Sequence, residues 1–321
     1  MEKNLFRLAV LTLPLLGCVF PASAMAQDYP TKPLRFIVGP GPDVLARLLG
    51  QKLTESWGQQ VVVDQRPAVG GMVAADAVAK AAPDGHTLLL STATYTTLMS
   101  LYPKVPYDFV KDLTPVSLLA SIPFLLVVHP SVPARSTQEL IRLARARPGQ
   151  LNYASSGVGA TSHLAHELLN NMAGIKTVHV PYKGTVAGLI DLISGQVHMM
   201  LGIMQGTLPS AKAGKIRALA VSGSKRSSSA PELPTIAESG VPGFEFTSWN
   251  GVHVTAGTSK AIIGKLHAEL LKILALPDVK ERMFDLGLEQ VGSTPEELAA
   301  LVNANIEKWG KLIRDLGVRV E

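Results

Sequence analysis

Short apolar runs alternate with amphipathic segments along most of this chain. Residues 34–38 (LRFIV) form a continuous apolar run, which is typical of a strand covered on both faces. Residues 43–57 repeat apolar side chains at helical spacing, and Asp43 is placed to cap that helix. Because strand and helix patterns alternate in this way, the sequence predicts an α/β fold with mainly parallel strands.

The same alternation continues to the C-terminus. Further strands are expected at residues 61–64, 86–91, 151–155, 177–180, 197–202 and 216–222. Further helices are expected at residues 71–81, 137–147, 160–172, 184–194, 207–213, 260–275, 278–286 and 295–316.

Two long extended stretches interrupt this alternation. Residues 116–130 contain two apolar runs, and residues 248–257 form a second extended segment. If each stretch carries the chain between domains, the first lobe contains residues 27–122 and 248–321, and the second lobe contains residues 123–247. The 321 residues are enough for two such domains. The pattern therefore predicts two lobes with a cleft between them.

The first 26 residues have the features of a secretory signal. A basic start with Lys3 and Arg7 precedes the apolar residues 8–20, and a small-x-small end lies at 24–26. An apolar stretch of 13 residues is too short to span a bilayer, which takes about 20. The sequence therefore predicts export to the periplasm, with lipoprotein anchoring through Cys18 as the alternative.

Composition narrows the function classes. Hydrophobic residues make up 47% of the chain and charged residues 17%, which excludes a disordered protein. Cys18 is the only cysteine, so the exported chain is expected to have no disulfide, thiolate metal site or cysteine nucleophile. Without Glu2, Lys3 and Arg7, the 30 basic and 25 acidic residues become 28 and 24, a net charge of +4. No basic run is dense enough to bind nucleic acid, whereas a small anionic ligand is tolerated.

The strongest local signal lies in residues 151–169 (LNYASSGVGATSHLAHELL). A strand is expected to end at Ser155, and a helix to begin near Ala160 after a loop of small residues. The free amides and positive dipole of a helix N-terminus attract anions, and neighbouring hydroxyls can donate to carboxylate oxygens. The alternative is an ordinary capped helix after a Gly/Ser turn.

Enzyme motifs fit this segment poorly. Residues 157–159 (GVG) suggest a dinucleotide loop, but Ser162 replaces the third glycine and no acidic ribose partner follows the next strand. His163 and His166 are three residues apart, whereas zinc proteases space their histidines four apart. No hydrolase elbow or phosphate-binding loop is present in the sequence. We therefore expect no catalytic residues, no metal and no cofactor.

Three further turns follow expected strands, at residues 39–43, 91–97 and 179–184. In open α/β sheets, ligands bind beyond the carboxyl ends of the strands. We therefore expect these turns and the loop of residues 151–169 to line one shared cleft.

Eight segments between Tyr29 and the C-terminus carry a family resemblance. They are YPTKPLRFIV, DVLARLLGQKL, DQRPAVGGMVAADAVAKAAPDGHTLLL, LNYASSGVGATSHLAHELL, VHVPYKG, GKIRALAVS, LPTIAESGVPGFE and GSTPEELAALVNANIEKWGKLIRDLG. Together they resemble the periplasmic solute-binding components of tripartite tricarboxylate transporters, of the Bug and TctC type. The resemblance implies a type II periplasmic binding protein fold that closes two βα lobes on a small organic acid. It also implies integral membrane permease subunits as partners; we expect a monomer that binds no nucleic acid.

The same resemblance implies a set of ligand-binding residues. They belong to the first strand–helix turn, the STAT turn, the YASSGVGATSH turn, the PYKG loop and the stretch around the second tryptophan. These residues are Pro40, Gly41, Thr92, Ala93, Thr94, Ser156, Gly157, Gly159, Thr161, Ser162, His163, Tyr182, Lys183, Gly184 and Trp249.

Two departures from the family pattern bear on the ligand. The turn at residues 38–43 is shorter than the usual aromatic-x-Pro-Gly-Gly-x-x-Asp form. Many members carry Asp or Asn at the end of the strand written here HMMLGI, where Leu201, Gly202 and Ile203 offer no polar side chain. The ligand is therefore expected to be a di- or tricarboxylate or, as a more apolar alternative, an aromatic carboxylate.

Three alternatives to a transport receptor remain open at this level. A ligand-loaded sensor that reports to a membrane signalling partner would use the same closing lobes. A nucleotide-dependent enzyme is motivated by residues 157–159 and the nearby histidines. The shortened first turn could also leave a folded protein that binds no ligand.

Overall fold

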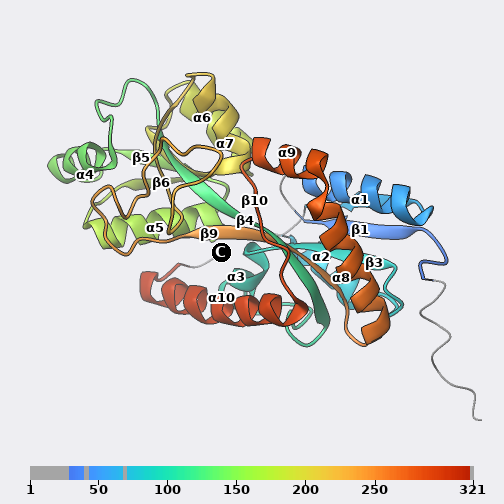
Figure 1. Cartoon of the computed structure of the whole chain (residues 1–321). Coiled ribbons are helices and arrows are strands. Elements are labelled where there is room, and N and C mark those ends of the chain that lie inside the picture. The colour runs from blue at the N-terminus through green and yellow to red at the C-terminus, as the bar shows by residue number, and fades with distance from the viewer. Residues whose placement is uncertain (1–28, 40–42, 68–70, 319–321) are drawn as a thin grey trace, which may run out of the picture.

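The computed structural model describes residues 29–39, 43–67 and 71–318 (Figure 1). The predicted signal segment lies outside these residues, as do Pro40 and Gly41. The strands are β1 (Leu34–Val38), β2 (Val61–Gln65), β3 (Thr87–Thr92), β4 (Leu113–Val128), β5 (Asn152–Ser155), β6 (Val178–Pro181), β7 (Met199–Ile203), β8 (Arg217–Val221), β9 (Thr247–Thr255) and β10 (Glu289–Gln290). The helices are α1 (Val44–Trp57), α2 (Met72–Ala79), α3 (Thr94–Leu101), α4 (Thr137–Ala146), α5 (Thr161–Ala173), α6 (Thr185–Ile193), α7 (Met204–Lys212), α8 (Lys260–Ala275), α9 (Pro277–Asp285) and α10 (Pro295–Leu316).

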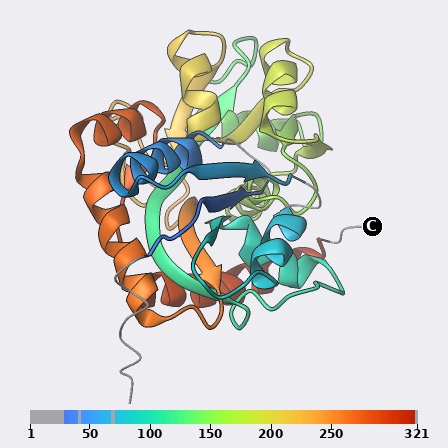
Figure 2. The same ribbon diagram turned by 90° about the vertical axis from the view of Figure 1, so that its right-hand side faces the viewer.

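A strongly curled sheet forms the centre of the molecule, and β4 bends along its length (Figure 2). Its strand order is β2-β1-β3-β9-β4-β7-β5-β6, and β8 and β10 also pair with β4. β1 runs parallel to β2 and β3, and β5 runs parallel to β6 and β7. β4 and β9 run antiparallel to all their described partners. The prediction of mainly parallel strands therefore holds within each half and is wrong at the centre, because β4 and β9 run antiparallel to each other and to the strands beside them.

β4 joins a first half of the sheet, containing β1, β2 and β3, to a second half, containing β5 to β8. Its residues 113–123 pair with β9, its residues 124–128 pair with β7 on one edge, and its residues 125–128 pair with β8 on the other. The change of partner falls at Pro123, which lies opposite Thr247, the first residue of β9. Proline has no backbone N–H to donate to a ladder, so it suits the place where one strand pairing ends.

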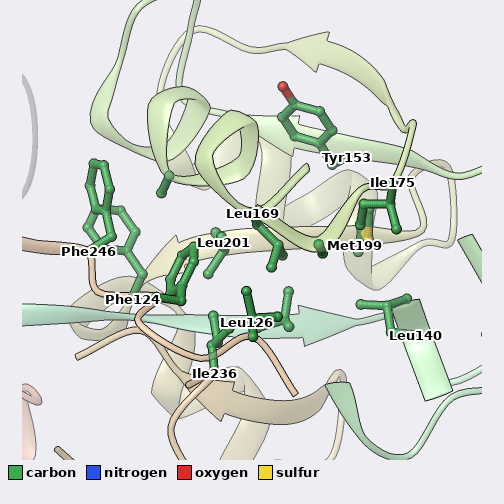
Figure 3. Packing of buried hydrophobic residues seen from close by; sticks show 14 of the residues in the cluster. Phe124, Leu126, Leu140, Tyr153, Leu169, Ile175, Met199, Leu201, Ile236 and Phe246 are labelled. Carbon is green, nitrogen blue, oxygen red and sulfur yellow. The ribbon is translucent and has the colours of Figure 1, made fainter. Parts of the chain in front are cut away.

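Apolar clusters cover both faces of each half, because successive strand residues point to opposite faces. In the first half, Phe36 packs with α1 and α8, whereas its neighbour Ile37 packs with α2 and α3. In the second half, Leu125 faces α6 and α7, whereas Leu126 faces α5. Figure 3 shows part of this last cluster, in which Leu126 lies near Leu201 of β7 and Leu169 of α5.

Helix α10 contacts both halves. Its first turns contribute Leu298 and Val302 to the cluster around α3, and its last turns contribute Trp309 and Ile313 to the cluster of the second half. Asn305 lies between these two groups. Its Oδ1 accepts hydrogen bonds from the indole N–H of Trp249 at 3.1 Å and from that of Trp309 at 3.0 Å. One amide oxygen thus links β9 to α10.

Three local features differ from the sequence predictions. Helix α3 was not predicted, because its sequence TYTTLMSL is rich in β-branched and aromatic residues of low helix propensity; its packing against α10 overrides that propensity. The two-residue strand β10 was also missed. Asp43 precedes α1 but makes no capping bond, since its carboxylate pairs with Arg47 instead.

The search for membrane-crossing helices covered the part of the chain that the structure describes. No helix there combines the length and the apolar character that a bilayer span requires.

Candidate functional site

A cavity of about 570 Å³ lies beyond the carboxyl ends of the parallel strands. It is lined by residues that end or follow β1, β3, β5, β6 and β7, together with residues of the crossing strands β4 and β9. This size is typical of a small-molecule pocket. The described lining residues are Val38, Gly39, Pro67, Leu90, Thr92, Thr94, Tyr95, Ile122, Phe124, Ser156, Ala160, Thr161, Ser162, Lys183, Gly184, Thr185, Ile203, Gln205, Ser248 and Asn250.

The structure brings part of the predicted ligand-binding set to this cavity. Seven of those residues line it: Thr92, Thr94, Ser156, Thr161, Ser162, Lys183 and Gly184. Pro40 and Gly41 lie outside the described residues, although Gly39 just before them is a lining residue. The remaining six are not among the lining residues: Ala93, Gly157, Gly159, His163, Tyr182 and Trp249.

Four helices begin beside the cavity without a side-chain cap. No side chain caps the first turn of α3, α5, α6 or α7, whose N-cap residues are Ala93, Ala160, Gly184 and Ile203. Away from the cavity, α4, α8 and α10 are each capped by a serine or threonine hydroxyl, whereas α9 begins at Pro277 without a side-chain cap. The first-turn amides of a helix need partners and carry a partial positive charge. The ends facing the cavity therefore suit an anion.

The loop before α5 is held by its own side chains. The Ser162 hydroxyl accepts a hydrogen bond from the Ser156 amide at 2.9 Å and also bonds the Ser156 hydroxyl at 2.9 Å. Behind them, Gly159 adopts a left-handed φ of 73° and its amide donates to Nδ1 of His163 at 3.0 Å. Two of the predicted residues, Gly159 and His163, thus shape the loop from behind.

The cavity has little formal charge. Lys183, which follows β6, is the one cation among its described lining residues, and no carboxylate lines it there. Tyr95 adds a buried hydroxyl that has no hydrogen-bond partner within the described ranges. Burial raises the pKa of the Tyr95 phenol, so it remains neutral. A single cation with many neutral donors fits a small anion better than a highly charged one.

His163 and His166 of α5 and His179 of β6 form a stack of rings with Tyr153. The rings of His163 and His179 lie 3.9 Å apart, and those of Tyr153 and His166 lie 4.0 Å apart. Burial lowers the pKa of His163 to about 4 and that of His166 to about 3, so both are neutral near pH 7. The described residues contain no group of three metal-ligating side chains.

Two predicted residues lie beside the cavity wall with partners of their own. The Tyr182 hydroxyl donates to Asp191, in the last turn of α6, at 2.7 Å. Trp249 is 3% exposed and packs into the core of the first half, because its side chain points to the opposite face of β9 from its neighbours.

Those neighbours, Ser248 and Asn250, are lining residues that the sequence analysis missed. The signal was available, since side chains alternate along a strand and only one set can face a cleft. Thr185 and Gln205 were missed as well, and Tyr95, although it lies in the predicted turn of residues 91–97, was not named as a ligand-binding residue. A local sequence pattern does not show which residues of two distant segments line the same cavity.

Known proteins of one family are similar to this chain in sequence and structure. A sequence model of the family described as "Tripartite tricarboxylate transporter family receptor" matches residues 45–318. Protein BugT of Bordetella pertussis is 35% identical over 320 residues, which cover 98% of each chain. The solved structure of R. palustris Rpa4515 with adipate is 37% identical, has a TM-score of 0.85, and is matched over 91% of this chain and 99% of its own. The structure of MatC from Rhodopseudomonas palustris with bound malate is 33% identical, has a TM-score of 0.79, and is matched over 88% and 99%.

Proposed function

The chain belongs to the tripartite tricarboxylate transporter receptor family, and on this basis we propose that its cavity captures a small organic carboxylate for delivery to membrane permease subunits. Like its relatives, it is a solute-binding receptor and not an enzyme. The predicted two-lobe α/β fold is confirmed, since solved receptors of this family match over both halves of the sheet. The two halves of the sheet are these two lobes.

The observation that carries this proposal is the set of uncapped helix ends around one cavity. The first turns of α3, α5, α6 and α7 face it, and its rim supplies hydroxyls and Lys183. A carboxylate accepts hydrogen bonds from amides and hydroxyls and is stabilised by the helix dipoles. The ligands of the two similar solved structures, adipate and malate, are both small carboxylates.

The crossing strands provide a hinge for capture. α3 belongs to the first lobe, whereas α5, α6 and α7 belong to the second. A carboxylate ligand that contacts both sets holds the lobes together, and rotation about the two crossings near Pro123 and Thr247 opens them. Closure excludes water from the ligand, which strengthens each hydrogen bond that the ligand accepts.

Export and partners complete the proposal. The signal features of residues 1–26 support a periplasmic location, and the family description names a transporter receptor. We expect the closed, loaded protein to bind permease subunits as a monomer.

Isothermal titration with dicarboxylates, tricarboxylates and aromatic acids tests the binding proposal. Ser162→Ala removes a lining hydroxyl, and we expect the affinity for every bound acid to fall about tenfold or more. Ser136→Ala is the matched control, because Ser136 caps α4 away from the cavity. The control should lose about 1 kcal/mol of unfolding free energy with unchanged affinity. Absence of binding by every acid in the panel contradicts the proposal.

A further inference from the structure

The strand order of the sheet places an apolar strip between two groups of polar residues. Along the order β3-β9-β4-β7-β5-β6, β3 and β9 supply the polar Thr92, Ser248 and Asn250 beside the apolar Leu90. The cavity residues of β4 and β7 are all apolar, and those after β5 and β6 are polar again apart from Ala160 and Gly184. The sequence of polar, apolar and polar surface follows directly from which strands are neighbours.

The apolar strip consists of Ile122, Phe124 and Ile203. Ile122 and Phe124 are two residues apart on β4, so their side chains share one face of the sheet. Phe124 lies opposite Ile203 in the antiparallel pairing of β4 with β7. Cross-strand partners stand side by side on one face. The three side chains therefore form one continuous hydrocarbon surface.

The first-lobe polar group lies on one side of this strip and consists of Thr92, Thr94, Ser248 and Asn250. Thr92 pairs with Asn250 between β3 and β9, and Ser248 pairs with Ile122 between β9 and β4. The group thus directly adjoins the apolar strip. It offers hydroxyl and amide donors without a formal charge.

The second-lobe polar group lies on the other side, at the first turns of α5, α6 and α7 and in the loops before α5 and α6. It consists of Ser156, Thr161, Ser162, Lys183, Thr185 and Gln205. Lys183 places the positive charge at this end. The sequence at 40–42 and 68–70, which the structure does not describe, contains no ionisable residue.

Resting on the proposed function, we propose that the ligand is a carboxylate with a hydrocarbon body, polar at both ends and without hydroxyl groups between them. One carboxylate lies at the second-lobe polar group, the hydrocarbon body covers the apolar strip, and a second polar end meets the first-lobe polar group. Ile122 and Ile203 set this preference. An aliphatic dicarboxylate has this pattern, whereas a hydroxy acid such as malate places a hydroxyl against hydrocarbon.

The physical reason is the asymmetry between apolar and polar burial. Methylene groups gain free energy when they leave water for an apolar wall. A hydroxyl buried against the same wall loses its hydrogen bonds to water without replacement. Hydrophobic pockets discriminate against an added hydroxyl by up to about 100-fold.

Two matched ligand pairs test this inference by isothermal titration. Adipate and galactarate are six-carbon dicarboxylates that differ in the hydroxyls of the body, and succinate and malate differ by one hydroxyl. We expect succinate to bind about 10- to 100-fold more tightly than malate, and adipate to exceed galactarate by at least as much.

Substitutions in the strip assign the preference to its residues. Val and Thr have nearly the same shape, so Ile203→Thr and Ile203→Val differ mainly by a hydroxyl in place of a methyl group. We expect the Thr variant to reduce the adipate-to-galactarate ratio several-fold relative to the Val variant. The same pair of changes at Ile122 provides a second test away from the start of α7. Ser162→Ala should weaken both ligands equally and leave the ratio unchanged.

Each result separates this inference from the proposed function. If malate or galactarate binds as tightly as its partner, or if the Thr and Val variants behave alike at both positions, the hydrocarbon-body inference is wrong and carboxylate binding stands. If no carboxylate binds the unmodified protein, the proposed function is wrong, and this inference is wrong as well.

Discussion

Gly159 lies where the second lobe touches the first. Its φ is 73°, and a Cβ placed on it would lie 2.5 Å from Cδ1 of Leu101, at the end of α3. Real Cβ atoms do not approach other carbons so closely, and Leu101 is 8% exposed, so its side chain has little room to move. Gly149 has the same φ of 73° but nothing within 4 Å of its Cβ position. The two glycines therefore have the same backbone conformation and differ only in how closely other atoms pack around an added Cβ.

The expected losses follow from that difference. A left-handed alanine costs about 1–2 kcal/mol at either position. Overpacking adds about 1–3 kcal/mol at Gly159. We expect Gly149→Ala to lower the free energy of unfolding by about 1–2 kcal/mol and Gly159→Ala to lower it by about 2–5 kcal/mol. In a Leu101→Ala background the clash is absent. Gly159→Ala should then lower the free energy of unfolding only by the cost of a left-handed alanine, about 1–2 kcal/mol.

Urea unfolding followed by circular dichroism measures all five proteins needed: the unmodified chain, both glycine variants, Leu101→Ala and the Leu101→Ala/Gly159→Ala double variant. The double-mutant cycle isolates the coupling between the two positions. Equal losses for the two glycine variants refute the close approach of the lobes at this point. So does a Gly159→Ala loss that is unchanged when Leu101 is alanine.

Two further predictions concern stability. Burial lowers the pKa of His166 and that of His253 to about 3, so between about pH 6.5 and pH 3 the unfolded chain binds protons that the folded chain does not. The free energy of unfolding should therefore be at its full value above about pH 6.5 and fall by roughly 2 kcal/mol or more per histidine by pH 4.5. Urea midpoints at pH 7.0, 5.5 and 4.5 measure this, and a flat profile contradicts it. Asn305→Leu leaves two buried indole N–H groups without their acceptor and should lose roughly 2–4 kcal/mol in the same urea assay at pH 7; a loss below about 1 kcal/mol would show that neither bond matters.

The sequence analysis located most strands and helices because their signals are local. The apolar run at residues 34–38 became β1, and the amphipathic segment after it became α1. The small-residue loop before α5 was predicted to lie at a ligand site from its local sequence alone, and the structure places Ser156, Thr161 and Ser162 at the cavity. Capping serines and threonines at α4, α8 and α10 have equally local signals.

The errors occurred where distant contacts override local preference. The residues of α3 have low intrinsic helix propensity, and the helix forms because it packs against α10, almost two hundred residues further along the chain. Asp43 has a better partner in Arg47 than in the amides of α1. Trp249 was expected at the ligand, but its side chain lies on the buried face of β9, where Asn305 of α10 accepts its N–H.

Local patterning thus specified the α/β class, the strand–turn–helix units and the loops that hold hydroxyls and glycines, since hydrophobic period and turn chemistry act over a few residues. The tertiary structure decided which of those loops share a cavity, because strand order and register depend on contacts between distant segments. Pairing of Phe124 with Ile203, and of Ile122 with Ser248, joins residues about 80 and 126 positions apart. Only that register turns scattered isoleucines and serines into an apolar strip flanked by polar groups.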